Sequence, residues 1–259
     1  MSQLWLPNSE LNLVVAVPSG ETWCAEFGMS LVGLIGDLAS TPVPPWSATQ
    51  VRVFNKKGSI LPQLRQQVTE QALEAGATHI LFLDSDQQFP PDTARRLLFW
   101  RKPIVACNVA TKKFPCSPTA RLYSPSEPKG VPLFTRRGDR GLEPVWRIGC
   151  GIMLIAGYVL KELPKPWFPV RWRTEVEDFQ GEDWGFCEAL EARDIPIYVD
   201  QELSWQIGHV GTQRYDHGLI IPPEVAEEFG KEDEGDSKQG IEGVEGEARA
   251  RRDHEALYV

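Results

Sequence analysis

The chain has 259 residues, of which 42% are hydrophobic and 24% charged, and its formal net charge is −9. This length and apolar share suit one large domain or two small ones with a buried core. The longest apolar runs are strand-sized, far short of the ~20 residues that a membrane span needs. No basic segment opens the sequence, so we expect no secretory signal. Five cysteines form an odd set without a CxxC pair, which argues against a disulfide framework or structural zinc and favours the cytoplasm.

The charge is unevenly distributed along the chain. Residues 224–259 hold twelve acidic and five basic residues and few apolar ones, which predicts a disordered acidic tail. Residues 95–173 hold sixteen basic residues against four acidic ones, a local net charge of +12. These basic residues are either solvated loop positions or a surface that meets a polyanion such as nucleic acid.

Apolar segments alternate with amphipathic ones, which is typical of an α/β domain. In chain order, strands are predicted at 11–17, 51–54, 79–83, 103–107, 145–148, 151–156 and 195–199. Helices are predicted at 23–38, 61–75, 92–100, from 158 and at 182–192, and Gly76 is a predicted helix C-cap. Residues 112–144 are predicted to form loops with short strands, and residues 164–173 a loop. We therefore expect one domain over 1–223 and the tail over 224–259.

Two carboxylates, Asp84 and Asp86, flank Ser85 directly after the predicted buried strand 79–83. Ligands bind at the carboxyl edge of open α/β sheets, where these side chains would project. Paired carboxylates need a cation or hydrogen-bond donors to offset their repulsion, and a divalent ion bridging to a diphosphate fits. The same pattern is also ordinary for a solvated turn at a strand end.

Three further motifs carry candidate chemistry. Glu182 and Asp183 open a predicted helix, where acids cap the helix or one of them acts as a general base. His209 lies between two glycines and is either structural or a metal ligand. Gly149, Cys150 and Gly151 predict a tight turn or a bare backbone that packs against a sugar or phosphate. A nucleophilic thiol at Cys150 lacks a supporting His or Asn pattern.

In this order the motifs resemble those of GT-A glycosyltransferases, over about residues 11–211. The resemblance rests on the first strand ending in Val17-Pro18, a helix that carries Arg65, Leu83-Asp84-Ser85-Asp86 as the DxD motif, Gly149-Cys150-Gly151, Gly181-Glu182-Asp183 as the ED motif, and Gly208-His209. The segment from Phe82 to Pro90 is most similar to small family-2-like enzymes of bacteriophages and prophages. No QxxRW motif follows the ED motif, which argues against a processive polysaccharide synthase. The resemblance implies a Rossmann-like, mostly parallel sheet flanked by helices.

The resemblance also implies roles for individual residues. Asp84, Asp86 and His209 would hold Mn²⁺ or Mg²⁺, and Asp84 would alternatively contact the donor ribose. Asp183 would be the catalytic base of an inverting transfer, supported by Glu182. The nucleotide-sugar-binding part would span about 1–110. The donor, a UDP-sugar, would be contacted by the set Pro18, Ser19, Gly20, Arg52, Arg65, Asp84, Ser85, Gly149, Cys150 and Gly151. Residues 111–223 would form the acceptor side.

Three hypotheses for function remain open at this stage. The first is a metal-dependent glycosyltransferase without a membrane segment, acting in a bacterial host cytoplasm if phage-derived. Its acceptor could be a hydroxymethylated pyrimidine of phage DNA, flipped out against Trp167, Trp172 or Phe168. A surface glycan, a lipid-linked acceptor and a protein acceptor also remain open. The second is a nucleotidyltransferase, against which the absence of a basic residue in 18–22 counts. The third is a nucleic-acid-binding module that keeps the fold without the chemistry. The oligomeric state is not indicated.

Overall fold

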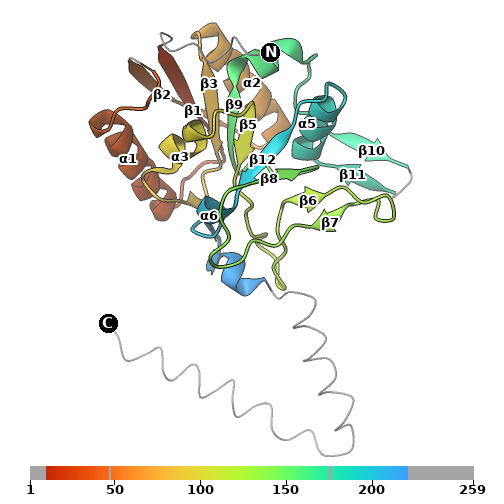
Figure 1. Cartoon of the computed structure of the whole chain (residues 1–259). Coiled ribbons are helices and arrows are strands. Elements are labelled where there is room, and N and C mark those ends of the chain that lie inside the picture. Colours follow the sequence, from red (N-terminus) through yellow and green to blue (C-terminus); the bar gives the residue numbers. More distant parts are fainter. Residues whose placement is uncertain (1–9, 47, 175–176, 221–259) are drawn as a thin grey trace, which may run out of the picture. The chain divides into compact units, whose positions relative to one another are not determined.

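The computed structural model describes residues 10–46, 48–174 and 177–220, so the predicted acidic tail at 224–259 lies outside the described residues (Figure 1). Its centre is a seven-stranded sheet. In spatial order the strands are β2 (Thr49–Lys57), β1 (Leu11–Ser19), β3 (His79–Leu83), β9 (Ile152–Ala156), β5 (Ile104–Ala106), β12 (Ile197–Asp200) and β8 (Leu142–Val145). All run in one direction except β9 and β8, which are antiparallel to their neighbours.

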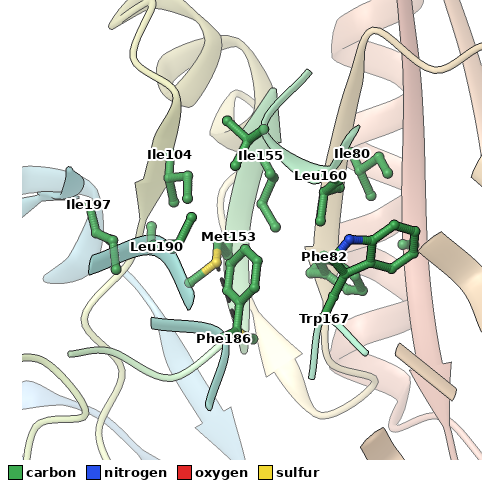
Figure 2. Packing of buried hydrophobic residues seen from close by; sticks show 14 of the residues in the cluster. Ile80, Phe82, Ile104, Met153, Ile155, Leu160, Trp167, Phe186, Leu190 and Ile197 are labelled. Carbon is green, nitrogen blue, oxygen red and sulfur yellow. Dashed lines mark hydrogen bonds between the residues drawn. The ribbon is translucent and has the colours of Figure 1, made fainter. Parts of the chain in front are cut away.

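Helices cover both faces of this sheet because its central strands are apolar on both sides. Along β1, Leu13 and Val15 face one hydrophobic cluster, and Val14 and Ala16 face the other. The first cluster includes residues of α1 (Ala25–Ser40), α3 (Thr93–Phe99) and α6 (Gln201–Ser204). The second includes residues of α2 (Leu61–Glu74), α4 (Gly157–Glu162) and α5 (Glu182–Glu191), and Figure 2 shows its packing. The predicted α/β class, with a mostly parallel sheet flanked by helices, is confirmed.

Short strands outside the central sheet form three small sheets. β4 (Gln87–Gln88) pairs with β13 (Gly208–Val210), which pairs with β14 (Arg214–Tyr215). Two hairpins, β6 (Arg121–Leu122) with β7 (Val131–Pro132) and β10 (Arg171–Arg173) with β11 (Asp178–Gln180), lie beyond the β8 edge of the central sheet (Figure 1). A 3₁₀ turn follows at His217–Leu219. Short strands were expected within 112–144, where β6 and β7 lie, but 164–173 was expected to be a loop and its last three residues form β10. Strands of two or three residues are too short to show an alternating pattern, so the sequence does not fix their positions.

The boundary of one predicted strand was wrong. Residues 145–148 were expected to form a strand, whereas β8 ends at Val145 and begins at Leu142. The backbone after β8 turns instead to Arg121, whose carbonyl oxygen accepts hydrogen bonds from the amides of Trp146 and Arg147. β8 thus closes the edge of the sheet and directs Trp146 towards the two hairpins.

Within the residues that the structure describes, no helix combines the length and apolarity that crossing a lipid bilayer requires.

Candidate functional site

The turn that follows β3 lies at the carboxyl edge of the sheet and is held on both sides by backbone hydrogen bonds. The amide of Asp84 donates to the carbonyl of Gly151 at 2.9 Å, just before β9 begins. The amide of Gln87 donates back to the carbonyl of Asp84 at 3.1 Å, which closes the turn. The carbonyl of Asp86 accepts from the amide of Val210 on β13 at 2.7 Å. The turn is therefore fixed between two segments that are distant in sequence.

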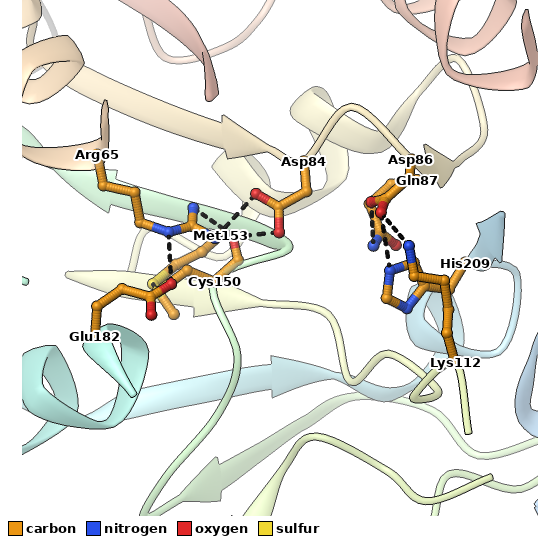
Figure 3. Close-up of polar contacts among 9 residues, drawn as sticks. All are labelled: Arg65, Asp84, Asp86, Gln87, Lys112, Cys150, Met153, Glu182 and His209. Carbon is orange, nitrogen blue, oxygen red and sulfur yellow. Dashed lines mark hydrogen bonds and ion pairs between the residues drawn. The ribbon is translucent and has the colours of Figure 1, made fainter. Parts of the chain in front are cut away.

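Arg65 of α2 is buried beneath this turn and binds two acids (Figure 3). Its Nη2 donates to both carboxylate oxygens of Asp84, at 2.9 and 3.1 Å, and its Nε donates to Oε1 of Glu182 at 3.4 Å. Its Nη1 lies 3.5 Å from the carbonyl oxygen of Cys150. Burial raises the pKa of Asp84, and the Arg65 guanidinium opposes that rise. Arg65 was predicted to line the nucleotide pocket; instead it lies below the pocket and orients the acids.

Asp86 faces the other way, towards Lys112 and His209 (Figure 3). Its Oδ2 lies 2.5 Å from Nζ of Lys112 and 3.4 Å from Nε2 of His209. Burial would raise the pKa of Asp86, but hydrogen bonds from His209 and Lys112 lower it to about 2. The Nδ1 of His209 lies 2.9 Å from the carbonyl oxygen of Ala110. Because a carbonyl only accepts, Nδ1 carries a hydrogen. Nε2 faces Asp86; with a hydrogen of its own it donates to the carboxylate, and without one it has a lone pair for a cation.

The predicted metal-binding trio is not assembled. Among the described residues, no group of three His, Cys, Asp or Glu side chains is placed to hold a metal ion. Asp86 and His209 come together as predicted, but Asp84 turns to Arg65. The reason is local: Asp84 to Asp86 form a closed turn rather than an extended strand, so the two carboxylates point to different sides of it (Figure 3).

A pocket of about 200 Å³ lies above this turn. Its lining includes five of the predicted donor-binding residues, the residues that follow β2 and the start of α2: Pro18, Ser19, Gly20, Gly58, Ser59, Leu61, Leu64, Asp84, Ser85 and Asp86. Arg52 does not reach it. This side chain lies at the middle of β2, opposite Val14, and donates to the carbonyl of Ala75 and to Gln50. The mid-strand register thus keeps Arg52 away from the carboxyl edge.

The turn Gly149-Cys150-Gly151 separates Asp84 from Asp183. A Cβ on Gly151 would lie 3.6 Å from Oδ2 of Asp84, and one on Gly149 would lie 3.5 Å from Oδ2 of Asp183. The Cys150 side chain is buried in the core, where its Sγ lies 3.9 Å from Sδ of Met153. Burial raises the thiol pKa well above its ordinary value. Cys150 is therefore no nucleophile, and only the backbone of this turn is available to a ligand.

Asp183 stands at the start of α5 beside a second, larger cavity. Its Oδ1 accepts a hydrogen bond from the amide of Trp184 at 2.8 Å. Burial, followed by the neighbouring Glu182 carboxylate, raises the pKa of Asp183 to about 6. A carboxylate of that pKa is mostly ionised at neutral pH and still able to take up a proton. The cavity measures about 360 Å³, and its walls include Trp146, Phe179 and Trp184.

Two of the aromatic residues nominated to stack a flipped base cannot do so. Trp167 and Phe168 are buried in the core cluster shown in Figure 2, with 3% and 2% of their surface exposed. Trp172 lies on β10 and is 54% exposed. Its ring packs edge-on against Phe179 with a centroid separation of 5.1 Å.

The sequence interpretation missed Lys112, Gln87 and Gln180. Lys112 falls in the segment predicted as a loop, and only the folded chain shows that its ammonium group binds Asp86. Gln87 follows the DxD motif directly; it is buried, and among the described residues nothing donates to its Oε1. Gln180 lines the cavity beside Asp183. In the sequence, only its position just before Glu182 and Asp183 could have indicated that it belongs to the site.

The overall architecture is shared with a solved viral protein. No protein-family model and no curated protein sequence matches this chain. The crystal structure of A197 from STIV matches with a TM-score of 0.52 and 15% identity, covering 78% of this chain and 86% of that one. This likeness shows a common fold. S. aureus TarS, solved in complex with UDP-GlcNAc, matches over 74% of this chain and 56% of its own at 13% identity; its TM-score of 0.37 is too low to define a shared fold.

Proposed function

We propose that the protein is a glycosyltransferase that moves a sugar from a nucleotide-sugar donor to an acceptor hydroxyl group. The observation that carries the proposal is the arrangement of two cavities around one turn. A small pocket holds Asp86 at the carboxyl edge, and a larger cavity holds Asp183 on the other side of Gly149-Cys150-Gly151. Two substrates could therefore meet across a strip of bare backbone. The order of motifs, which resembles that of GT-A enzymes, supports the same conclusion.

Asp86 and His209 would hold a divalent cation, Mn²⁺ or Mg²⁺. The donor set suits such an ion: a carboxylate with a low pKa, an imidazole nitrogen, and the unpartnered amide oxygen of Gln87 beside Asp86. The ammonium group of Lys112 already places a positive charge against Asp86. When bound, the metal would neutralise charge on the departing diphosphate. The remaining ligand positions would be available to phosphate oxygens of the donor.

The nucleotide would occupy the pocket lined by Pro18, Ser19, Gly20 and Ser85. Asn55 donates to the carbonyl of Val17 and to Oγ of Ser19, both at 2.8 Å, and so fixes the end of β1. Asp84, held by Arg65, is oriented to accept a hydrogen bond from a ribose hydroxyl. The choice of a UDP-sugar follows from the resemblance to GT-A enzymes.

Asp183 would act as the general base of an inverting transfer. Its raised pKa matches the task, because it must hold the acceptor proton only transiently. Glu182 binds Arg65 rather than the cavity, so its role is to position the start of α5. The reaction then needs an acceptor hydroxyl within hydrogen-bond reach of Asp183.

A DNA acceptor, a hydroxymethylated pyrimidine, was proposed from the basic segment 95–173. Eight of the sixteen basic side chains in that segment form ion pairs with described acids: Arg95, Arg96, Lys112, Lys129, Arg147, Lys165, Arg171 and Arg173. Their charge is thus partly neutralised within the fold. Of the nominated stacking residues, Trp172 alone is exposed. The structure gives this acceptor less support than the sequence did.

The test is donor hydrolysis without acceptor. The full chain is incubated with Mn²⁺ and a panel of nucleotide sugars, and release of nucleoside diphosphate is assayed with and without a chelator. We expect slow hydrolysis of one donor, lost with chelator and in Asp86→Ala. Glu74→Ala, an exposed acid at the opposite end of α2, is the matched control and should retain activity.

Two results would contradict the proposal. Full activity of Asp86→Ala, or of the chelated enzyme, would remove the metal role. Failure of every nucleotide sugar both to be hydrolysed and to raise the melting temperature in the presence of Mn²⁺ would remove the donor. Nucleoside triphosphates in the same panel test the nucleotidyltransferase alternative.

A further inference from the structure

The cavity beside Asp183 has a well-defined construction. One wall is Trp146, which follows β8, and Trp184 of α5 lies against it with ring centroids 6.3 Å apart. Phe179 of β11 and Lys129, between β6 and β7, also line the cavity. Its volume of about 360 Å³ falls in the range of small-molecule sites. Aromatic rings of this kind offer flat apolar faces to a ligand ring.

Basic side chains also line the cavity, but each is paired with an acid. Nζ of Lys129 lies 3.8 Å from Oδ2 of Asp178, and Nη1 of Arg173 lies 2.6 Å from Oε1 of Glu188. Arg147 binds Glu191 at 2.6 Å and stacks on the Trp146 ring, with its Cζ 4.0 Å from the ring centroid. Among the described lining residues no cation is left unpaired. The cavity is therefore poorly suited to a phosphate group.

One buried polar group on the cavity wall lacks a partner. Gln180 is 5% exposed, and its Oε1 accepts a hydrogen bond from Nη1 of Arg173 at 2.6 Å. Its Nε2 has no acceptor among the described residues. A buried donor left without a partner is costly, so a ligand oxygen at this position would be favourable. Gln180 and Asp183 both line the cavity, so a ligand hydroxyl that reached the buried N–H of Gln180 could pair with it and with the Asp183 carboxylate.

From this arrangement we propose that the cavity beside Asp183 is a subsite for a neutral sugar, whose hydroxyl group is the acceptor of the transfer. The inference rests on the proposed function and names the acceptor class of the same site. A sugar ring presents C–H groups that pack on Trp146 and Trp184, and hydroxyl groups that both donate and accept. It carries no charge, which matches the paired cations of the lining.

In the proposed step, the acceptor hydroxyl donates its hydrogen bond to the carboxylate of Asp183. Its oxygen forms a bond to the anomeric carbon of the donor as the bond from that carbon to the diphosphate oxygen breaks. The proton passes to Asp183, and the electron pair leaves with the nucleoside diphosphate. No oxidant, reductant or further reactant is needed.

The experiment measures saccharide binding directly. Saturation-transfer NMR on the full chain is run with a panel of neutral mono- and disaccharides, and with single- and double-stranded oligonucleotides that contain hydroxymethylcytosine. The variants are Trp184→Leu, which removes one ring of the cavity, and Gln180→Glu, which keeps the acceptor for Arg173 but removes the N–H donor. Phe99→Leu, on α3 and 72% exposed outside the cavity, is the control.

We expect at least one neutral saccharide to bind the wild type and Phe99→Leu, with a Kd raised about tenfold or more in Trp184→Leu. Gln180→Glu should weaken binding of the same saccharide. If Trp184→Leu does not fold, the Kd of Gln180→Glu tests whether the saccharide binds in this cavity. The absence of saccharide binding, or equal binding by both variants, would overturn the inference. Binding of the oligonucleotide in place of saccharides would overturn it in favour of DNA.

Donor hydrolysis, assayed on the same samples, separates the two proposals. Hydrolysis without saccharide binding would count against the neutral-sugar subsite and leave the glycosyltransferase proposal standing. Saccharide binding that depends on Trp184, without hydrolysis or binding of any nucleotide sugar, would count against the transferase and support the subsite.

Discussion

Asp84 and Asp86 are two residues apart and belong to two differently built clusters. Asp84 lies in a buried cluster with Arg65, Glu182 and, across the Gly149-Gly151 turn, Asp183; burial raises the pKa of Asp84 and Asp183. Asp86 lies in a more open cluster with Lys112 and His209, which lowers its pKa. One motif thus supplies a carboxylate to a buried, mostly acidic cluster and another to a more open cluster with two basic side chains. A buried guanidinium holds the acids of the first cluster in place, whereas the carboxylate of the second faces two partly exposed basic side chains.

The largest expected effect is a loss of transfer rate when Asp183 is replaced. Asp183→Asn should lower the rate of sugar transfer about 10²–10⁴-fold, because the amide cannot accept the acceptor proton. In the wild type, kcat/KM should fall as the pH drops through about 6, the pKa of Asp183, since the base is active only when ionised. A pH–rate profile checks both. A variant with wild-type transfer, or a profile flat through this range, would exclude Asp183 as the base.

The second-largest expected effect is on stability and follows removal of the buried Arg65 guanidinium. Arg65→Met leaves Asp84 and Glu182 without their shared partner, and we expect a loss of about 3–5 kcal/mol in the free energy of unfolding. Urea denaturation measures it. Lys57→Met breaks an exposed pair with Glu21 and should cost about 0–1 kcal/mol. Equal costs for the two variants would remove the distinction between buried and exposed pairs.

A smaller effect on stability should depend on pH. The pKa of Asp183 is raised from 3.8 to about 6, so its contribution to stability is complete below 3.8 and is lost as the pH rises through about 6. Asp183→Asn should therefore be about 1–3 kcal/mol more stable than the wild type above that range and equal to it at the acid end. Thermal unfolding across pH checks the sign. A variant less stable at neutral pH would contradict it.

The smallest expected effect is on the Mn²⁺ requirement and concerns the cluster of Asp86, Lys112 and His209. Lys112 binds the Asp86 carboxylate at 2.5 Å and would compete with a metal for it. Lys112→Met should therefore lower the Mn²⁺ concentration needed for half-maximal donor hydrolysis about threefold to tenfold, with less than about 1 kcal/mol change in stability. Lys113→Met, the exposed neighbour, is the control. A higher Mn²⁺ requirement in Lys112→Met would mean that the ammonium group assists the cation site.

The central sheet could be predicted from the sequence because its signals are local. The apolar runs 79–83 and 151–156 became β3 and β9, the latter beginning at Ile152. The predicted C-cap at Gly76 has a φ of +77°, in the left-handed region where glycine ends helices. The carboxyl-edge position of Asp84 and Asp86 followed from the same reasoning.

The partners of the site residues could not be predicted, because they come from distant segments. The spacing of Asp84 and Asp86 says nothing about the turn that separates their carboxylates. The orientation of Arg65 depends on acids brought from β3 and α5. Arg52 has the charge expected of a phosphate ligand, but its position in the middle of β2 keeps its side chain away from the pocket. The aromatic walls at Trp146 and Trp184 likewise depend on how β8 meets α5.

The pairing of β4 with β13 has a consequence for the order of synthesis. Gln88 and Arg214, which touch across this small sheet, are 126 positions apart. A nascent chain that has emerged from the ribosome as far as β12 already contains all seven strands of the central sheet. It still lacks His209 and the amide of Val210 that holds Asp86. All seven central strands are therefore synthesised before His209 and Val210 are available to contact Asp86.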